Sequence, residues 1–323
     1  MRGFWRAIPP LVGASALAAA IYLSGPERIA SSLSRADPIP LLGAVGAESL
    51  AIILMGVAWH LLIKGASESP RLADSIRATG LEVFVDATIP TGSVGGELLR
   101  IAYARNKMGV SIWSALAAAV VLRVLVAGVL SSLLAIAAYM GLARLGGMWL
   151  LLAASITAII AVAALSARPA ALVGLVPARY RPLAESVLRP LSSLMRSKLT
   201  PVALAFVAAE ISSSATTQVL AFLALGYRIP YYLVLLAYPI YDVLVALPTG
   251  IPGSFGIADV GTSLIYASFG VAWSEALAAM IATRVICLIA DAALGLPTFV
   301  LEGRHLAPPP EIMSALRGEG RRG

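Results

Sequence analysis

The sequence has few charged residues, one cysteine and two histidines, and each shortage excludes a class of protein. Only 13% of the 323 residues are charged. An average soluble domain carries roughly a quarter, so the chain is not an ordinary cytosolic enzyme. The single cysteine, Cys287, cannot form an internal disulfide. The two histidines, His60 and His305, give no metal cluster of familiar spacing, and the sequence has no P-loop motif for ATP hydrolysis. We therefore expect no cofactor.

Apolar residues are abundant instead, at 59% of the chain, and they recur in long runs from end to end. About 20 apolar residues in a helix cross a hydrocarbon core of about 30 Å. The sequence therefore predicts an all-α, polytopic membrane protein. The predicted full spans are Ala7–Ser24, Ile39–Ile63, Ile112–Met140, Met148–Ser166, Val202–Leu225 and Ala272–Leu301. The first could instead be a signal peptide, because basic residues precede its apolar core.

Two further apolar stretches, Leu81–Tyr103 and Tyr232–Phe269, are interrupted by proline and glycine. Both contain the sequence Pro-Thr-Gly. It runs from Pro90 to Gly92 in the first stretch and from Pro248 to Gly250 in the second. Proline removes a backbone donor and glycine weakens a helix, so each stretch is expected to form two half-helices joined by an unwound tip. We interpret both as re-entrant hairpins, and two short complete crossings in each stretch are the alternative.

The distribution of basic residues orients these segments. A formal net charge of +7 could suggest nucleic acid, but the basic residues are spread over loops between apolar runs, where membrane topology explains them. With the N-terminus inside, 17 of the 24 Lys and Arg residues lie inside, four lie outside and three fall within membrane segments. We therefore expect a cell-membrane protein with both termini cytoplasmic. Residues 1–301 are expected to form one membrane domain and residues 302–323 a cytoplasmic tail.

The segment Ala167–Thr200 is neither a span nor a simple loop. It holds six basic residues against one acidic residue, Glu185, with leucine and valine at helical spacing. This pattern predicts an amphipathic helix on the inner leaflet, and a solvated linker is the alternative.

The two halves of the chain, about 7–140 and about 148–301, match each other. Gly109, Ala115–Ala118 and Arg123 recur as Gly270, Ala276–Ala279 and Arg284, at a constant offset of 161 residues. In the orientation given above, the first hairpin enters from inside and the second from outside. The sequence therefore predicts an inverted repeat, a design that recurs in transporters with broken helices.

Ionisable residues within the predicted membrane segments form the candidate site, because charges facing lipid are costly and should face a polar interior. They are Glu48, Asp86, Glu97, Arg100, Arg123, Glu210, Asp242, Asp259, Arg284 and Asp291. Arg123 and Arg284 each lie mid-span after a hairpin, where a guanidinium can bind a lipid phosphate with two hydrogen bonds. The half-helices that follow the Pro-Thr-Gly tips could add backbone N–H groups.

The acidic members of this set have several possible roles. Glu48, Glu97, Glu210 and Asp259 could balance the arginines, bind a cationic headgroup or carry a coupling proton. Asp86, Asp242 and Asp291 are further candidates for coupling. The alternative is structural: Arg123 and Arg284 would form salt bridges with Glu97, Asp259 or Asp291 that lock the hairpins.

The two hairpins, each followed by a glycine and an arginine-bearing helix, resemble the lysylphosphatidylglycerol synthase transmembrane-region family of flippase-like membrane proteins. The likeness runs from about the second span to the end of the chain, and one departure is Asp259, where a glutamate is expected. The family implies translocation of a lipid between leaflets, and its members fused to an aminoacyl-transferase domain are implied to flip aminoacylated phosphatidylglycerol. About 22 residues follow the last predicted span, which leaves no room for such a domain.

We therefore predict a lipid flippase that is not an enzyme and that moves a phospholipid or lipid-linked headgroup, with a phosphate, through a polar cavity at the hairpin tips. The first alternative is a scaffold that recruits a lipid-modifying or glycosyl transferase through the basic segment. The second is a membrane enzyme acting on a lipid phosphate, although the hairpins offer no nucleophile–base pair. No nucleic-acid partner is expected.

Overall fold

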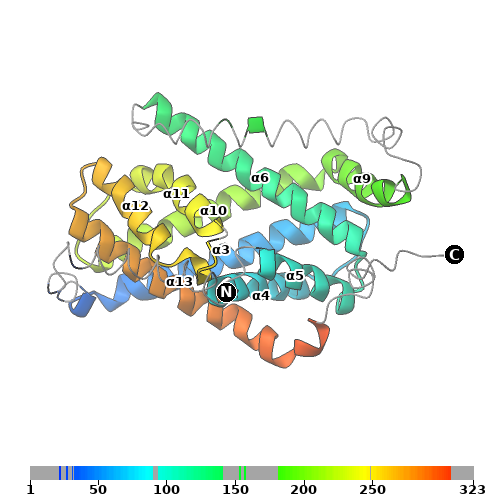
Figure 1. Ribbon diagram of the computed structural model, residues 1–323, viewed down its shortest axis with the longest axis horizontal. Helices are drawn as coiled ribbons and strands as arrows, with labels where there is room; N and C mark the ends of the chain where they lie inside the picture. Colours follow the sequence, from blue (N-terminus) through cyan, green and yellow to red (C-terminus); the bar gives the residue numbers. More distant parts are fainter. Residues whose placement is uncertain are drawn as a thin grey trace, which may run out of the picture.

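The computed structural model describes residues 33–89, 94–140, 181–247 and 249–306, together with residues 22, 27, 31, 153, 156 and 157. Every regular element in the described ranges is helical (Figure 1). The first-half helices are α3 (Pro38–Gly65), α4 (Leu72–Thr88), α5 (Val94–Asn106) and α6 (Ile112–Tyr139). They are followed by α9 (Arg181–Arg196), α10 (Leu199–Ala224), α11 (Tyr231–Ala246), α12 (Ile257–Ser268) and α13 (Trp273–Leu301). Two short 3-10 turns are η2 (Pro252–Ser254) and η3 (Gly303–His305).

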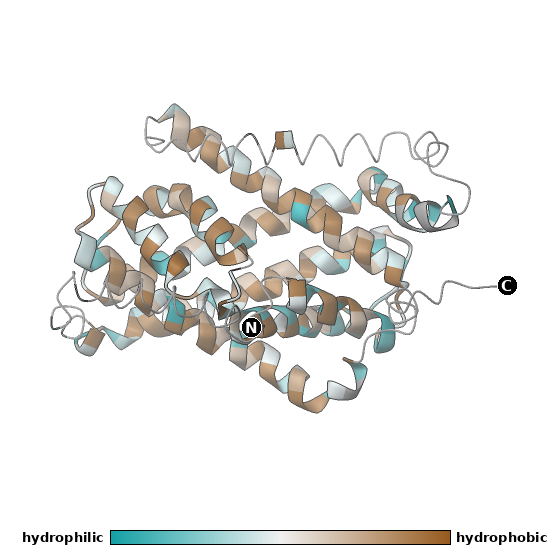
Figure 2. Ribbon diagram, viewed as in Figure 1, coloured by the Kyte–Doolittle hydropathy of each residue, from teal (hydrophilic) through white to brown (hydrophobic). Residues whose placement is uncertain are grey.

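Four of these helices, α3, α6, α10 and α13, are long and apolar enough to cross a membrane. They contain 26 to 29 residues. At 1.5 Å per residue they are about 39 to 44 Å long, more than the hydrocarbon core requires. Hydrophobic residues occur along their whole length (Figure 2). They coincide with four of the six predicted spans, and the other two, Ala7–Ser24 and Met148–Ser166, lie almost entirely outside the described residues.

Helices α3 and α10 pack against each other along their length and run antiparallel. At one end, the backbone N–H of Asp37, just before α3, donates to the carbonyl of Ala224 at the end of α10, at 2.7 Å. One-third of the way along α3, the hydroxyl of Ser213 donates to the carbonyl of Ala47 at 2.8 Å. The pair therefore places polar residues of both helices inside the bundle.

In each of the two interrupted stretches the structure has two helices that pack against each other, α4 with α5 and α11 with α12, and we call these pairs the first and the second hairpin. The chain leaves the helical conformation after Thr88 and again after Ala246, as the Pro-Thr-Gly sequences predicted. The two pairs occupy opposite ends of the bundle (Figure 1). The turn η2, at the tip of the second hairpin, packs against α4 of the first. The hairpins therefore meet in the middle of the bundle.

The first arm of the first hairpin is longer than the sequence indicated. The apolar stretch begins at Leu81, but α4 begins at Leu72, so the expected start was wrong by nine residues. The added turns are polar and helical: Asp74 lies in the first turn, where a carboxylate favours the helix dipole. Arg77 donates to Asp74 at 3.2 Å within the same helix. Polar residues that end an apolar run need not end a helix.

Helix α4 also packs closely against α13 at a pair of glycines. A Cβ atom added to Gly80 would lie 2.9 Å from the carbonyl oxygen of Leu294, and one added to Gly295 would clash with the carbonyl oxygen of Gly80. Phe84 and Phe299 follow on the same seam with ring centroids 5.8 Å apart. Small residues of this kind let membrane helices approach backbone to backbone.

The open end of the first hairpin is fastened to the end of α13 by Glu302. Its carboxylate accepts hydrogen bonds from the Tyr103 hydroxyl at 3.0 Å and pairs with Lys107 at 3.2 Å and Arg77 at 3.9 Å. Burial raises the pKa of Glu302, but the hydrogen bonds and positive charges of these partners outweigh it, so its pKa lies below the ordinary value. The ionised carboxylate is therefore stabilised by three side chains of the hairpin.

Helix α9 covers part of the predicted amphipathic segment 167–200, and residues 167–180 lie outside the described ranges. Leu191 and Leu194 are buried, and α9 packs against α6, α10 and α3. The Ser193 hydroxyl donates to the carbonyl of Gly65, at the end of α3. The apolar side of α9 therefore rests on the helical bundle.

Candidate functional site

A cavity of about 210 Å³ lies at the centre of the bundle. Its walls come from α3, α4, α5, α6, α10, α11 and α13 and from the tip of the second hairpin. A liquid water occupies about 30 Å³, so the space suits several waters or one small polar group. The charged residues that line it are Glu48, Glu82, Asp86, Arg100, Arg123, Glu210, Asp242, Arg284 and Asp291. Eight of these nine were predicted from the sequence, and Glu82 was not.

The first half contributes a network of two arginines and two glutamates. Arg123 donates to Glu82 at 3.4 Å and to Glu97 at 3.3 Å. Arg100 pairs with the same two carboxylates, and its guanidinium lies 4.7 Å from the centre of the Trp59 ring. The Arg100 side chain is only 1% exposed, whereas that of Arg123 is 47% exposed. Arg100 is thus a fixed structural cation, and Arg123 borders open space.

The second half contributes the pair of Arg284 and Asp259. The guanidinium lies 3.1 Å from the carboxylate, and their side chains are 8% and 1% exposed. Asp259 also accepts the backbone N–H of Gly256 at 2.8 Å, which caps the start of α12. The same carboxylate therefore holds the second hairpin and its arginine together.

The tip of the second hairpin lies directly against Arg284. A Cβ atom added to Gly253 would lie 3.1 Å from the guanidinium, and Gly253 has a positive φ of 53°, which favours glycine. The neighbouring Ser254 donates to the carbonyls of Val245 and Leu247. These bonds satisfy backbone groups where α11 ends, and they fix the tip beside the cavity.

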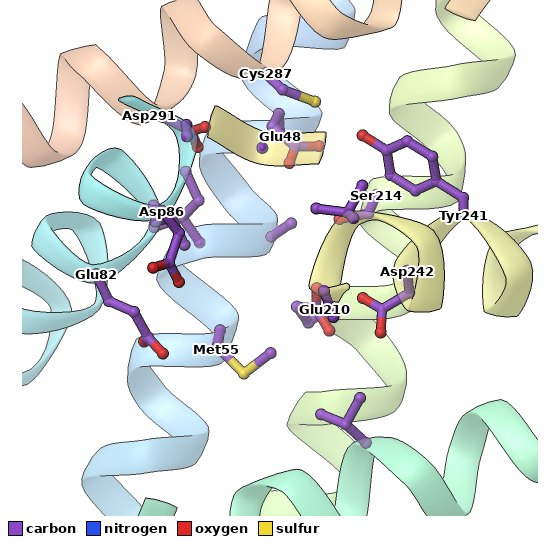
Figure 3. Close-up of a pocket in the computed structure, with 18 of the residues that line it drawn as sticks. Glu48, Met55, Glu82, Asp86, Glu210, Ser214, Tyr241, Asp242, Cys287 and Asp291 are labelled. Atoms are coloured by element: carbon purple, nitrogen blue, oxygen red, sulfur yellow. The ribbon is translucent and has the colours of Figure 1, made fainter. Parts of the chain in front are cut away.

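Five carboxylates that line the cavity, Glu48, Asp86, Glu210, Asp242 and Asp291, have no ion pair with a lysine or arginine in the described part of the chain. The Asp86 carboxylate accepts the backbone N–H of Gly96 at 2.9 Å. The acidic side chains come from several helices and surround a common space (Figure 3). The lining of the cavity therefore has more acidic than basic side chains.

The remaining predicted site residues lie behind or beyond the lining. Glu97 and Asp259 are not among the residues that line the cavity, and they pair with Arg123 and Arg284, as the structural alternative for those arginines expected. Gly250 lies in the second tip, next to the lining residue Ile251. The predicted tip residues Pro90, Gly92 and Pro248 lie outside the described residues.

Sequence reasoning missed several residues of the site. Glu82 lies at the start of the stretch Leu81–Tyr103, and the acid nearest to the repeat offset of 161 residues, Asp242, is displaced from it by one position, so the repeat did not reveal Glu82. Its spacing of four from Asp86, which puts both on one face of α4, was the available signal. Ser214, Tyr238 and Tyr241 also line the cavity, but such residues are common in membrane helices.

This arrangement can bind a molecule that carries charges of both signs. Arginines bind phosphate through paired, charge-assisted hydrogen bonds, and the unpaired carboxylates can bind an amine or protons.

The chain was compared with known protein families, and the model described as lysylphosphatidylglycerol synthase TM region matches residues 7–295. The chain belongs to this family. A search of curated protein sequences gave no match.

Membership in the lysylphosphatidylglycerol synthase TM family agrees with the apolar helices in identifying a membrane-embedded protein. The match includes both hairpins, both arginine-bearing helices and all the charged residues that line the cavity. The site described above therefore lies within the part of the chain that defines the family.

Proposed function

We propose that the protein translocates a phospholipid or lipid-linked headgroup between the two leaflets of a membrane. The observation that carries this proposal is a cavity with nine charged lining residues, bordered by four helices of membrane-spanning length, at the meeting point of the two hairpins. A headgroup crossing the bilayer needs polar partners along its path, since each unsatisfied polar group in hydrocarbon is costly. The acyl chains stay in the lipid, and the protein performs no covalent chemistry.

The packing of the two halves supports an inverted repeat. In the first half α3 packs on α4, α4 on α5 and α5 on α6; in the second half α10 packs on α11, α11 on α12 and α12 on α13. Contacts between the halves are also paired, because α4 packs on α13 and α11 on α6. With the hairpins entering from opposite ends, exchange between two related arrangements exposes the central cavity to one side and then the other. The basic residues of the loops favour cytoplasmic termini.

The charges of the cavity indicate which headgroup it suits. All three arginines are already engaged by carboxylates, and five further carboxylates have no cation in the described part of the chain. A headgroup with both a phosphate and an amine satisfies both kinds of group, whereas a purely anionic one leaves the five carboxylates without a cation. We therefore propose an amine-bearing phospholipid as the preferred cargo. The unpaired carboxylates also remain candidates for carrying a coupling proton.

The test is reconstitution in vesicles of phosphatidylethanolamine and phosphatidylglycerol, with either lipid labelled fluorescently on an acyl chain. A membrane-impermeant reductant then measures the rate at which labelled lipid reaches the outer leaflet. We expect Arg123→Ala and Arg284→Ala to slow the movement of phosphatidylethanolamine. Arg189→Ala is the matched control, because Arg189 is exposed on α9 and pairs only with Glu185 in the described structure. The proposal is refuted if lipid moves no faster in vesicles with the wild-type protein than in vesicles without protein. It is also refuted if both cavity variants move lipid at the wild-type rate.

A further inference from the structure

A second hollow, of about 570 Å³, opens on the outside of the bundle between α5 and α6. We call it the lateral groove, and its lining is Val94, Glu97, Leu98, Ile101, Leu116, Ala119, Val120, Arg123, Val124 and Ala127. Eight of these ten residues are apolar, and Val94, Leu98 and Val120 are 60%, 49% and 43% exposed. The groove follows α6 from Leu116 to Ala127, a length of about 16 Å at 1.5 Å per residue.

Arg123 borders both the lateral groove and the central cavity. It lies about 16 Å along α6 from Ile112, near the middle of this membrane-length helix. Its side chain is 47% exposed although it takes part in the ion-pair network. The guanidinium therefore stands at the wall between an apolar surface that faces outward and a polar space inside.

Arg123 can also change partners without leaving a carboxylate unpaired. Glu82 and Glu97 each pair with Arg100 as well as with Arg123, so both keep a cation if Arg123 moves to another anion. Unpaired buried charges are strongly destabilising, and this network avoids them. In the second half, Arg284 is the only cation paired with Asp259 in the described structure, so its release would leave that carboxylate alone.

In the second half, the arginine at the corresponding position, Arg284, is buried. Helix α12 packs more closely on α13 than α5 does on α6. The Arg284 side chain is 8% exposed, and the Phe255 ring lies 5.9 Å from its guanidinium. Of the two arginines related by the predicted repeat, only Arg123 can be reached from the lipid side.

We infer that the lateral groove is the lipid entrance, in which one acyl chain of a membrane phospholipid lies on α5 and α6 while its phosphate binds Arg123. This inference rests on the proposed function and adds the place where the lipid is captured. The exposed residues of the groove suit an acyl chain, because they are apolar and lie along α6, which is long and apolar enough to cross a membrane. The guanidinium at its inner edge suits the phosphate, and the acidic cavity beyond it suits the amine. In the proposed orientation the groove opens toward the inner leaflet.

The test uses a photoactivatable benzophenone side chain at Leu98, in the groove, in full-length protein reconstituted in vesicles of phosphatidylethanolamine and phosphatidylglycerol. The matched control position is Val285, which is 52% exposed on α13, a helix of membrane-spanning length in the second half. Crosslinked lipid is measured by mass spectrometry. We expect Arg123→Ala to reduce the yield of crosslinked lipid at Leu98 roughly tenfold, because the charged hydrogen-bond donor is lost. Arg123→Lys should reduce this yield less, because lysine keeps a charged donor. The Val285 yield stays constant.

A second variant, Val120→Trp, fills the groove and leaves Arg123 in place. We expect it to lower the Leu98 yield and to slow translocation, again without changing the Val285 yield. A Leu98 yield that is unchanged by both Arg123→Ala and Val120→Trp overturns the inference. A fall at Leu98 that is matched by an equal fall at Val285 in both variants also overturns it, because the groove is then no more selective than the lipid-facing surface.

The experiment separates this inference from the proposed function. Crosslinking requires binding but not translocation, so an Arg123-dependent yield at Leu98 in a protein that moves no lipid supports the groove and refutes translocation. Translocation that Val120→Trp does not slow, together with an unchanged Leu98 yield, refutes the groove as the entrance and leaves translocation standing.

Discussion

The close contact between α4 and α13 cannot accommodate an added methyl group at Gly295 without a shift of the backbone. Replacing Gly295 by alanine puts a Cβ atom closer than 3.0 Å to the Gly80 carbonyl oxygen, a distance that real Cβ atoms essentially never show. The obstacle is backbone, so no side-chain rotation relieves it. The two helices must separate, and α4 carries Glu82 and Asp86 into the cavity.

The size of the effect follows from this geometry. A gap of about 0.5 to 1 Å forfeits a quarter to a half of each dispersion contact across the seam. Overpacking of this kind destabilises a well-packed site by about 1 to 3 kcal/mol. Backbone on both sides of the contact argues for the upper part of this range, so we expect Gly295→Ala to lower the free energy of unfolding by about 2 to 3 kcal/mol.

The free energy of unfolding can be measured in mixed micelles by titration with SDS. The protein has one cysteine, Cys287, so a fluorogenic thiol dye reports unfolding at one site on α13. The control is Gly46→Ala, because Gly46 lies in α3 and a Cβ atom there meets nothing within 4 Å. This control should be neutral or should stabilise by up to about 1 kcal/mol, since alanine favours a helix more than glycine does. Equal effects of the two substitutions would refute the close seam.

Two further predictions concern ion pairs at the ends of the hairpins. Asp259→Asn leaves the Arg284 guanidinium buried without its partner and should lower the free energy of unfolding by about 3 to 5 kcal/mol in the same titration. Glu302 has a pKa below its ordinary value, so its contribution to stability is present above about pH 4.3 and is lost as the pH falls through the folded-state pKa. Wild-type protein should therefore lose thermal stability on acidification more steeply than Glu302→Gln.

Each of these has its own control. Asp259→Glu keeps the charge and should destabilise less than Asp259→Asn, and the reverse order would contradict the ion-pair argument. For Glu302, the comparison is Glu185→Gln, at an exposed ion pair on α9. This variant should lose thermal stability on acidification as steeply as the wild type does. Parallel acid profiles for wild type and Glu302→Gln would show that this junction does not hold the hairpin.

The sequence predicted the long helices well, because their apolar length is set by the membrane. The predicted span Ile112–Met140 and the helix Ile112–Tyr139 differ by one residue. The start of α4 was missed by nine residues because its first turns are polar and rest on tertiary contacts, such as Arg77 with Glu302. Hydropathy cannot identify contacts between residues more than 200 positions apart.

The candidate site was predictable in its membership but not in its pairing. Charges in apolar runs must face a polar interior, so eight charged residues of the cavity lining could be named in advance. Which carboxylate holds which arginine depends on the distances between helices. The sequence treated Arg123 and Arg284 as equivalent, and the structure distinguishes them by exposure, at 47% and 8% of their side chains.

The fastening at Glu302 has a mechanical consequence. The chain continues past η3, and two links near that point, Glu302 with Tyr103 and Lys107 and the His305 carbonyl with the Asn106 side chain at 2.9 Å, attach it to α5. A pull on the chain beyond His305 therefore acts on the first hairpin as well as on α13. A displacement of the end of α13 is therefore transmitted to α5, the helix that carries Glu97 and Arg100.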